Sequence, residues 1–386
     1  MLSNKNDAQY DSGLTRDYRR INSVQTVSVQ WLAKWTDNYS TRLLVSGGTD
    51  RGEEALNGST STVSYDQTEI STLMWTNEYR RGAHLFSASV ENRKDQFLLV
   101  GSSAVPVGSA FVSREKAQNS VGLGYGWTGG AHTVQLNMRR DRDSEFGGKS
   151  TGSAGYAYAL SPQWKVSSSA GNSFRVPILY QRFTIYAPLS VLLPEEGRNL
   201  ELGLKYLESG SNYGVVAYRN KMTNLLSFVS GVGACPSGLR PAATREGCYA
   251  NTLRAEYTGL TFTASEKMGN YRLYGSLDTQ SPKDTTTNLQ LIRRAKQHAT
   301  FGVDTHVGQW TLAGDVLLSS MRYNNATNTS KLPGYALANV SASTLLAKDW
   351  KALLRVDNLA DKMYQTVSGY ATARRTLYVG LTWAPH

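Results

Sequence analysis

Histidines, cysteines and carboxylates are the residues of this sequence that could carry out chemistry, and their spacing does not form an enzyme signature. The chain of 386 residues holds five histidines, which are His84, His132, His298, His306 and His386. No two of them have the H-x-x-x-H or H-E-x-x-H spacing of a zinc site on a helix. We therefore predict that the protein is not an enzyme. The alternative is a hydrolase whose catalytic side chains come from loops that are distant in the sequence.

The two cysteines, Cys235 and Cys248, bracket a stretch rich in glycine and proline, GACPSGLRPAATREGCYAN. They lack the C-x-x-C spacing or the nearby histidine of a metal site, although metal ligation and unpaired thiols stay open as alternatives. We expect a disulfide, because closing about a dozen residues stabilises a loop by roughly 3 kcal/mol in the chain-entropy model. Such a bond implies an oxidising compartment.

The stretch SVGLGYGWTGG, residues 120–130, has the glycine content of a phosphate-binding loop. Such a loop needs a strand before it and a helix after it, but the following AHTVQLNMRR has no helical period. The residues alternate instead with the period of a strand, which places Val121, Leu123, Tyr125 and Trp127 on one face and Gly122, Gly124 and Gly126 on the other. We expect the apolar face to contact lipid and the glycine face to leave room for something beside it.

The same alternation recurs along the chain and predicts about 17 strands of roughly ten residues, with no convincing helix. Each strand is long enough to cross a bilayer. Long polar stretches such as DRGEEALNGSTS, RDRDSEFGGKS and YNNATNTSKLPG lie between short connections at residues 36–38, 80–83, 127–131, 161–163, 208–212, 267–270, 306–309 and 347–349. Alternating short turns and long loops indicate an all-β fold, an antiparallel transmembrane β-barrel with the long loops outside the cell.

Tryptophans lie near the ends of the expected strands, as the aromatic girdles of a membrane barrel do: Trp31, Trp35, Trp127, Trp164, Trp310, Trp350 and Trp383. The alternative is the core of a soluble sandwich. The net charge of +11 comes from lysines and arginines that are scattered singly or in pairs, which favours a solvated surface over a nucleic-acid site. No run of 18 apolar residues and no apolar signal core is present.

Several motifs of the second half of the chain resemble those of TonB-dependent outer-membrane receptors. The stretches GNSFRVPILYQRF and LPEEGRNLELGLKY resemble the S-F-R-x-P and E-x-G signature of their barrels, and VDNLADKMYQTVSGYATARRTLYVGLTW resembles their C-terminal segment. Within that family, LQLIRRAKQHATFGVD, KLPGYALANVSAS and SGYATARR are most similar to the vitamin B12 (cobalamin) receptors.

The resemblance implies a bacterial outer-membrane barrel of about 22 strands around an N-terminal plug that binds TonB. It implies active transport of a corrinoid, with a siderophore or other metal chelate as the alternative cargo. We expect residues 1–386 to be the C-terminal part of that barrel, without the plug and the first strands, because the odd strand count would close the sheet on a parallel pair. A passive pore or a truncated remnant without function is the further alternative.

The resemblance also assigns binding residues. Arg293 and Tyr370 match corrinoid-binding positions, while Arg375 and Tyr323 are candidates from their place and chemistry. An aromatic that the family places near Thr327 is not retained. Asp7 and Asp17 in NDAQYDSGLTRD match ligands of a calcium loop, so Ca²⁺ in the full-length protein is the one cofactor implied. Lipid and lipopolysaccharide are expected partners, the latter through outer arginines; TonB would bind only through the plug, and nucleic acid is not expected.

Overall fold

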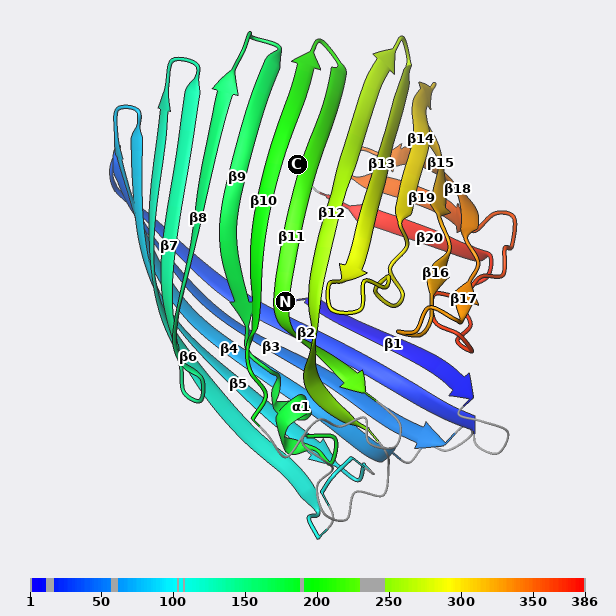
Figure 1. Ribbon diagram of the computed structural model, residues 1–386. Coiled ribbons are helices and arrows are strands. Elements are labelled where there is room, and N and C mark those ends of the chain that lie inside the picture. The colour runs from blue at the N-terminus through cyan, green and yellow to red at the C-terminus, as the bar shows by residue number, and fades with distance from the viewer. Residues whose placement is uncertain are drawn as a thin grey trace. The chain divides into compact units, whose positions relative to one another are not determined.

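Strands make up most of the computed structural model, which describes residues 2–11, 17–56, 62–102, 104–106, 108–187, 191–229 and 247–384 (Figure 1). The chain divides into two compact units. Unit 1 comprises Met1–Gly155, Gly171–Arg198 and Met222–Leu253, and unit 2 comprises Tyr156–Ala170, Asn199–Lys221 and Arg254–His386. Among the described residues, no helix is both long and apolar enough to cross a membrane.

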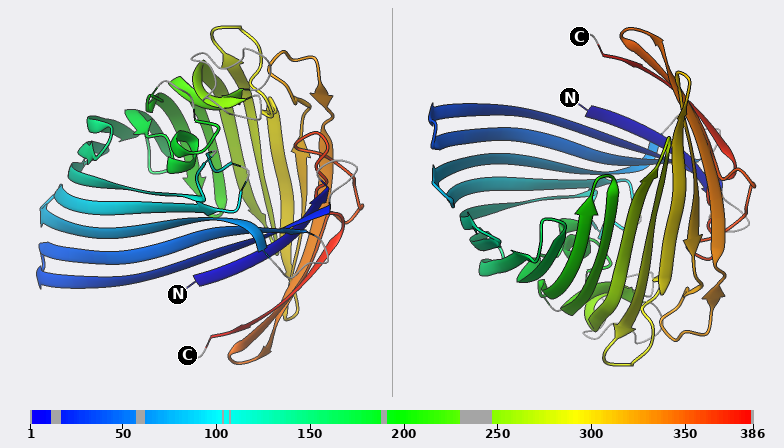
Figure 2. Two further views of the ribbon diagram at one scale, coloured as in Figure 1. Left: turned by 90° about the horizontal axis from the view of Figure 1, so that it is seen from below. Right: turned by 90° about the horizontal axis from the view of Figure 1, so that it is seen from above.

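Seven strands of unit 1 each pair with the next strand in sequence, always antiparallel (Figure 2). They are β1 (Leu2–Asp11), β2 (Asp17–Thr36), β3 (Tyr39–Leu56), β4 (Thr62–Arg81), β5 (His84–Val100), β6 (Phe111–Gly129) and β7 (His132–Asp143). The strands that follow, some of which run through both units, are β8 (Gly147–Ala159), β9 (Trp164–Arg175), β10 (Glu195–Glu208), β11 (Ser211–Val229) and β12 (Cys248–Met268).

Unit 2 continues the antiparallel pairing from β12 to the last strand. Its further strands are β13 (Tyr271–Asp284), β14 (Gln297–Val307), β15 (Trp310–Ser319), β18 (Tyr335–Ala347), β19 (Trp350–Asp357) and β20 (Thr376–Trp383). A small separate hairpin joins β16 (Arg322–Tyr323) to β17 (Lys331–Leu332). Eighteen strands belong to the large sheet, which confirms the expected all-β antiparallel fold.

The eight short connections are confirmed, because each expected turn joins two paired strands. Glycines with positive φ, such as Gly82 at 56° and Gly130 at 55°, supply the backbone conformation that a tight hairpin needs. The expected count of about 17 strands agrees with the 18 described in the large sheet. The segment expected to be a loop that forms a strand is β1. An even number of described strands does not require a parallel closing pair. That the plug and the first strands lie outside this chain stays a prediction.

Two expected long loops are wrong in part. Residues 50–56 of DRGEEALNGSTS belong to β3, and its residues 57–61 lie outside the described part of the chain. The stretch RDRDSEFGGKS belongs mostly to β7 and β8, and only residues 144–146 connect them. Asp143 Oδ1 accepts hydrogen bonds from the backbone N–H groups of Glu145 and Phe146, at 2.9 and 3.0 Å. A carboxylate that satisfies the turn backbone in this way makes a tight turn from a stretch that is polar enough to pass for a loop.

Each strand presents an apolar face and a polar face. In unit 1 the apolar face carries exposed residues that lie opposite one another across the strands, such as Trp75, Val90 and Val121. Near the short turns this face ends in aromatic pairs, among them Trp31 with Trp35 at 6.1 Å in unit 1 and Trp350 with Trp383 at 6.3 Å in unit 2. This arrangement fits the girdle that the sequence predicts.

The glycines of β6 lie on the polar face as expected, but the space above them is filled. A Cβ on Gly122 would lie 2.6 Å from Ser89 Oγ, and one on Gly124 would lie 2.3 Å from Ser87 Oγ. The serines of the neighbouring strand β5 occupy this space themselves. The glycines therefore allow the serines of β5 to pack closely against β6 and do not leave room for a ligand.

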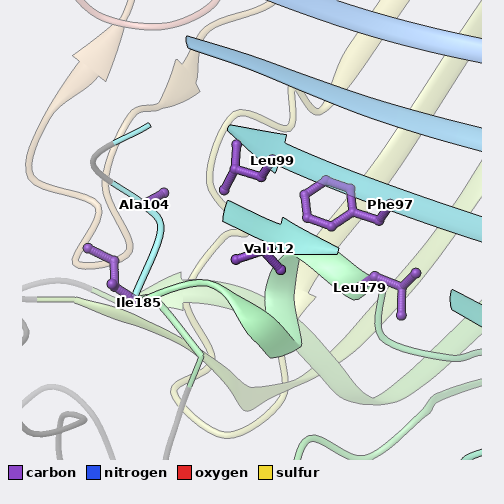
Figure 3. Close-up of a cluster of buried hydrophobic side chains, with 6 residues drawn as sticks. All are labelled: Phe97, Leu99, Ala104, Val112, Leu179 and Ile185. Carbon is purple, nitrogen blue, oxygen red and sulfur yellow. The ribbon is translucent and has the colours of Figure 1, made fainter. Parts of the chain in front are cut away.

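An apolar cluster in unit 1 fixes two of the longer connections (Figure 3). Its members are Phe97, Leu99, Ala104, Val112, Leu179 and Ile185. Leu179 begins α1 (Leu179–Phe183), a single helical turn that the sequence did not predict because five residues are too few to show a helical period. The backbone N–H of Ile185 also donates to Ala104 O at 2.9 Å, which joins the two connections directly.

Phe97→Ala is expected to loosen the connection between β5 and β6. The side chain is only 5% exposed, and truncating a buried phenylalanine costs about 3 kcal/mol or more. Proteolysis between Gly101 and Ala110 should become faster, whereas Phe86→Ala, on the same strand but the opposite face, should leave the rate unchanged. Equal rates for the two variants would contradict the role of the cluster.

Candidate binding site

Three connections of unit 2 form the candidate site, and each follows a strand that runs away from the short turns. Connection A, residues 285–296, joins β13 to β14; connection B, residues 320–334, joins β15 to β18 and contains the β16–β17 hairpin; connection C, residues 358–375, joins β19 to β20. Because these strands are neighbours in the sheet, the three connections emerge at the same end of the strands.

Arg293 and Tyr323, two of the predicted binding residues, are brought together. The backbone N–H of Arg293 in connection A donates to the carbonyl oxygen of Tyr323 in connection B at 2.7 Å. Arg293 adopts a φ of 58°, in the left-handed region that is unusual for a residue other than glycine. Its side chain is exposed and that of Tyr323 is half-buried. The turn is thus held by the backbone, which leaves the guanidinium group of Arg293 to the surface.

Asn328, which the sequence analysis did not identify, joins the same two connections. Its Oδ1 accepts from the backbone N–H of Gln290 at 2.9 Å, and its Nδ2 donates to Gln290 O at 2.9 Å. Within connection B, Asn325 Nδ2 donates to the hydroxyls of Thr327 and Thr329, at 2.9 and 2.7 Å. Thr327 therefore helps to order this connection. The only signal in the sequence was the asparagine content of YNNATNTS.

Tyr370 is presented by connection C close to the same place. The backbone N–H of Ser368 donates to Asn324 Oδ1 at 3.1 Å, which attaches connection C to connection B beside Tyr323. Gly369 has a φ of 80°, and the Tyr370 side chain is 62% exposed. The structure thus joins the segments that carry Arg293, Tyr323 and Tyr370.

Arg375 is mainly a residue that holds connection C together. Its Nε donates to Leu359 O at 2.8 Å, and its backbone N–H donates to Asp361 Oδ1 at 2.9 Å. Arg374 donates to the same carboxylate through Nε at 2.8 Å and Nη2 at 2.5 Å. The hydrogen bond from Arg374, followed by that from the Arg375 backbone, lowers the pKa of Asp361 to about 2.

Connection B contains a buried arginine, Arg322. Arg322 is 6% exposed, its Nη2 donates to Ser319 Oγ at 2.6 Å, and its guanidinium group lies 5.3 Å from the centre of the Tyr335 ring. Its Nε has no hydrogen-bond partner, and no described carboxylate forms an ion pair with it. An uncompensated cation at this depth makes the edge of unit 2 attractive to anions.

A charged cleft of about 510 Å³ lies on the polar face of unit 1. It is lined by side chains from strands β5 to β9, so no short motif could have revealed it. The cleft contains or borders ion pairs with N–O distances of 2.5 to 2.8 Å: Arg93–Asp95, Arg139–Asp141 and Arg175–Glu195. Among the residues that line the cleft, three arginines thus outnumber the two carboxylates, Asp95 and Asp141.

The calcium and disulfide assignments stay predictions. Asp7 lies in β1 opposite Ile21, and Asp17 begins β2 opposite Asp11, so the expected calcium loop is largely a pair of strands; its side chains lie outside the described part. The residues that are described contain no group of three metal-binding side chains. Cys248 begins β12 with 1% exposure, whereas Cys235 lies outside the described residues.

The stretch Gly148–Gly152, GKSTG, has the spacing of a serine-nucleophile elbow. An elbow needs a sharp turn from a strand into a helix, but here the stretch lies inside the continuous strand β8. Ser150 Oγ accepts a hydrogen bond from Arg140 Nη1 at 2.9 Å. The geometry therefore gives this serine no catalytic role.

The family model "TonB dependent receptor-like, beta-barrel" matches residues 2–359. The vitamin B12 transporter BtuB of Photobacterium profundum is 27% identical over 247 residues, which cover 64% of this chain and 40% of that protein. BtuB of Vibrio cholerae is 26% identical over 254 residues, covering 64% and 39%. The chain thus spans about two fifths of the length of these curated relatives.

Solved structures agree in fold. The ferric enterobactin receptor PfeA of Pseudomonas aeruginosa has a TM-score of 0.73 at 16% identity, covering 95% of this chain and 62% of that one. The FrpB iron transporter of Neisseria meningitidis has a TM-score of 0.74 at 12% identity, covering 95% and 63%. At such identities the similarity shows the fold alone.

Asn328→Ala is expected to release connection A from connection B. The variant loses both hydrogen bonds to Gln290 and also places alanine at a φ of 57°. Asn328→Gly removes the same hydrogen bonds, but glycine tolerates that φ. The difference between the alanine and glycine variants therefore measures the cost of the left-handed backbone conformation, about 1 kcal/mol. Hydrogen exchange at the Gln290 amide should be fastest in the alanine variant, slower in the glycine variant and slowest in the wild type. Unchanged exchange in both variants would contradict the contact.

Connection C is expected to loosen only in strong acid. Because the pKa of Asp361 falls from its ordinary 3.8 to about 2, its stabilising effect is complete above about pH 4 and is lost as the pH falls through 2. Hydrogen exchange at the Arg375 amide, corrected for the intrinsic pH dependence, should show protection at pH 4 that declines near pH 2. Asp361→Asn should remove this step, and a step that persists in the variant would assign it to another group.

Proposed function

We propose that this chain, which belongs to the TonB-dependent receptor β-barrel family, is part of a receptor that takes up a corrinoid of the vitamin B12 type. The family is one of outer-membrane receptors and transporters of Gram-negative bacteria, and this chain lies in that membrane. Its members bind a substrate and TonB, and TonB-driven uptake is part of the proposal. The observation that carries it is the joining of connections A, B and C around Arg293, Tyr323 and Tyr370.

The chemistry of these side chains suits a corrinoid. Such a ligand is large, is rimmed by amides and carries one phosphodiester. A guanidinium group binds a phosphodiester through two parallel charge-assisted hydrogen bonds, and the exposed Arg293 is available for this. Tyr370 offers an aromatic face and a hydroxyl, and the buried cation Arg322 adds positive potential. Arg375 contributes less, because its Nε already binds Leu359 O.

An anionic metal chelate is the second candidate cargo, and the charged cleft of unit 1 is the observation that favours it. Arg93 and Arg175 have side chains 42% and 59% exposed beside this cleft. Arg93 binds Asp95 through Nε and Nη2, and Arg175 binds Glu195 through Nε. Nη1 of Arg93 and the Nη groups of Arg175 are the donors that an anion would use. Calcium binding by Asp7 and Asp17, and lipopolysaccharide contact by the outer arginines, also stay proposals.

Arg293→Ala and Tyr370→Ala are expected to weaken cyanocobalamin binding to outer membranes that carry the protein. A hydrogen bond to a charged group contributes about 1.5–3 kcal/mol, so Arg293→Ala should raise the Kd by roughly ten- to hundredfold. Arg294→Ala is the matched control, because it removes the same charge from the next position.

Two outcomes would contradict parts of this proposal. If the wild type binds a ferric chelate and no cobalamin, the corrinoid assignment is wrong and the family stands. If the wild type binds cobalamin but neither variant changes the affinity by even about 1 kcal/mol, the site lies elsewhere. In that case Arg93→Ala and Arg175→Ala test whether the cleft of unit 1 is the site.

A further inference from the structure

A pair of tyrosines lies at the short-turn end of the apolar face of unit 2. The rings of Tyr206 and Tyr213 are stacked with centres 6.0 Å apart and an interplanar angle of 28°. Trp164 packs against Tyr206 with a centre distance of 4.9 Å. Tryptophan and tyrosine take this place at the boundary between lipid tails and headgroups, so the pair lies at headgroup height.

A carboxylate flanks each tyrosine of the pair. Tyr206 OH donates to Glu208, and Tyr213 OH donates to Glu266 Oε2 at 2.6 Å. Within the described part of the chain, neither carboxylate forms an ion pair with a lysine or an arginine. Two aromatic faces and two carboxylates without a cation are the chemistry that binds an ammonium group.

An apolar groove of about 590 Å³ begins at Tyr213, Glu266 and Trp164 and runs along the membrane-facing surface. Successive register pairs lead away from the turn, from Glu266 opposite Leu273 to Ala264 opposite Gly275 and Phe262 opposite Leu277. The small residues Ala264 and Gly275 lower the floor of the groove, since a Cβ on Gly275 would already lie 2.9 Å from Phe301 Cδ1. Its walls are apolar: Leu204, Val215, Phe262, Leu273, Leu277 and Phe301.

We propose that this groove and the tyrosine pair together bind a phospholipid that carries a primary amine, of the phosphatidylethanolamine type. One acyl chain fills the groove, and the ammonium group lies over Tyr206 and Tyr213 between Glu208 and Glu266. The same carboxylates repel a lipid whose headgroup is only anionic, so they select by charge as well as by contact. This lipid site requires that the chain lies in the outer membrane, and it does not depend on which substrate the receptor transports.

The test compares two lipids with the same acyl chains. Native mass spectrometry of the detergent-solubilised full chain is titrated with palmitoyl-oleoyl phosphatidylethanolamine or phosphatidylglycerol. We expect at least tenfold tighter binding of phosphatidylethanolamine. Glu208→Gln with Glu266→Gln should abolish this preference, and Ala264→Leu should weaken binding of both lipids at least fivefold by filling the groove.

Matched controls separate this site from the general surface. Glu69→Gln removes an exposed carboxylate of unit 1 that also accepts a hydrogen bond, from Gln67 at 2.6 Å, and Ala88→Leu enlarges an exposed residue on the apolar face of unit 1. Both should behave as the wild type. Equal affinity of the wild type for the two lipids would overturn the proposal even if a variant failed to fold, and so would unchanged binding in the double glutamine variant.

Discussion

A strand that crosses a membrane has to pair its backbone N–H and C=O groups with other strands, because the lipid interior offers no water to bind them. This chain meets that requirement by pairing each strand with its neighbour in sequence, as β5 and β6 do from His84 opposite Trp127 to Val100 opposite Phe111. Once this register is set, the period of two sorts the side chains onto an apolar and a polar face. The turns, the girdle and the connections all take their positions from the same ladder.

Features that depend on local pattern could be predicted from the sequence. Alternation identified nearly all strands, and glycines such as Gly82 and Gly130 marked turns. The pattern failed where polar residues alternate with polar residues. In β7 and β8 such stretches extend the sheet beyond the apolar zone, and a period-two signal needs an apolar set that these segments lack. The helical turn at Leu179 left no period to detect.

The candidate site was predictable only in part, because its connections meet through backbone atoms. The contact from Arg293 N to Tyr323 O involves no side chain and so has no sequence signature. Arg293 and Tyr370 came from family resemblance, while Asn328 and the buried Arg322 did not appear at all. Arg375 had the right charge for a ligand, yet residues within its own connection satisfy its Nε and backbone N–H groups. The charged cleft assembles from five strands, which no short motif can encode.

The two units hold their connections by different forces. In unit 1 hydrogen bonds such as those between Asn251 and Leu193 are joined by an apolar cluster around Phe97 and Leu179, and opening this cluster would expose hydrocarbon to water. In unit 2 amide side chains such as Asn328 and the ion pair of Asp361 with Arg374 do so, and water can replace these contacts at lower cost. Connections A, B and C are therefore the part of the described chain best suited to exchange their own hydrogen bonds for those of a ligand.

The length of the strands in unit 1 has a consequence for what the cell shows to its surroundings. β2 and β4 contain 20 residues each, whereas about 9–11 tilted residues are enough to cross a bilayer. At about 3.3 Å per residue and a tilt near 45°, the remainder raises the sheet roughly 20 Å above the lipid. An antibody or a bacteriophage that approaches the cell therefore reaches this rim before it reaches the membrane.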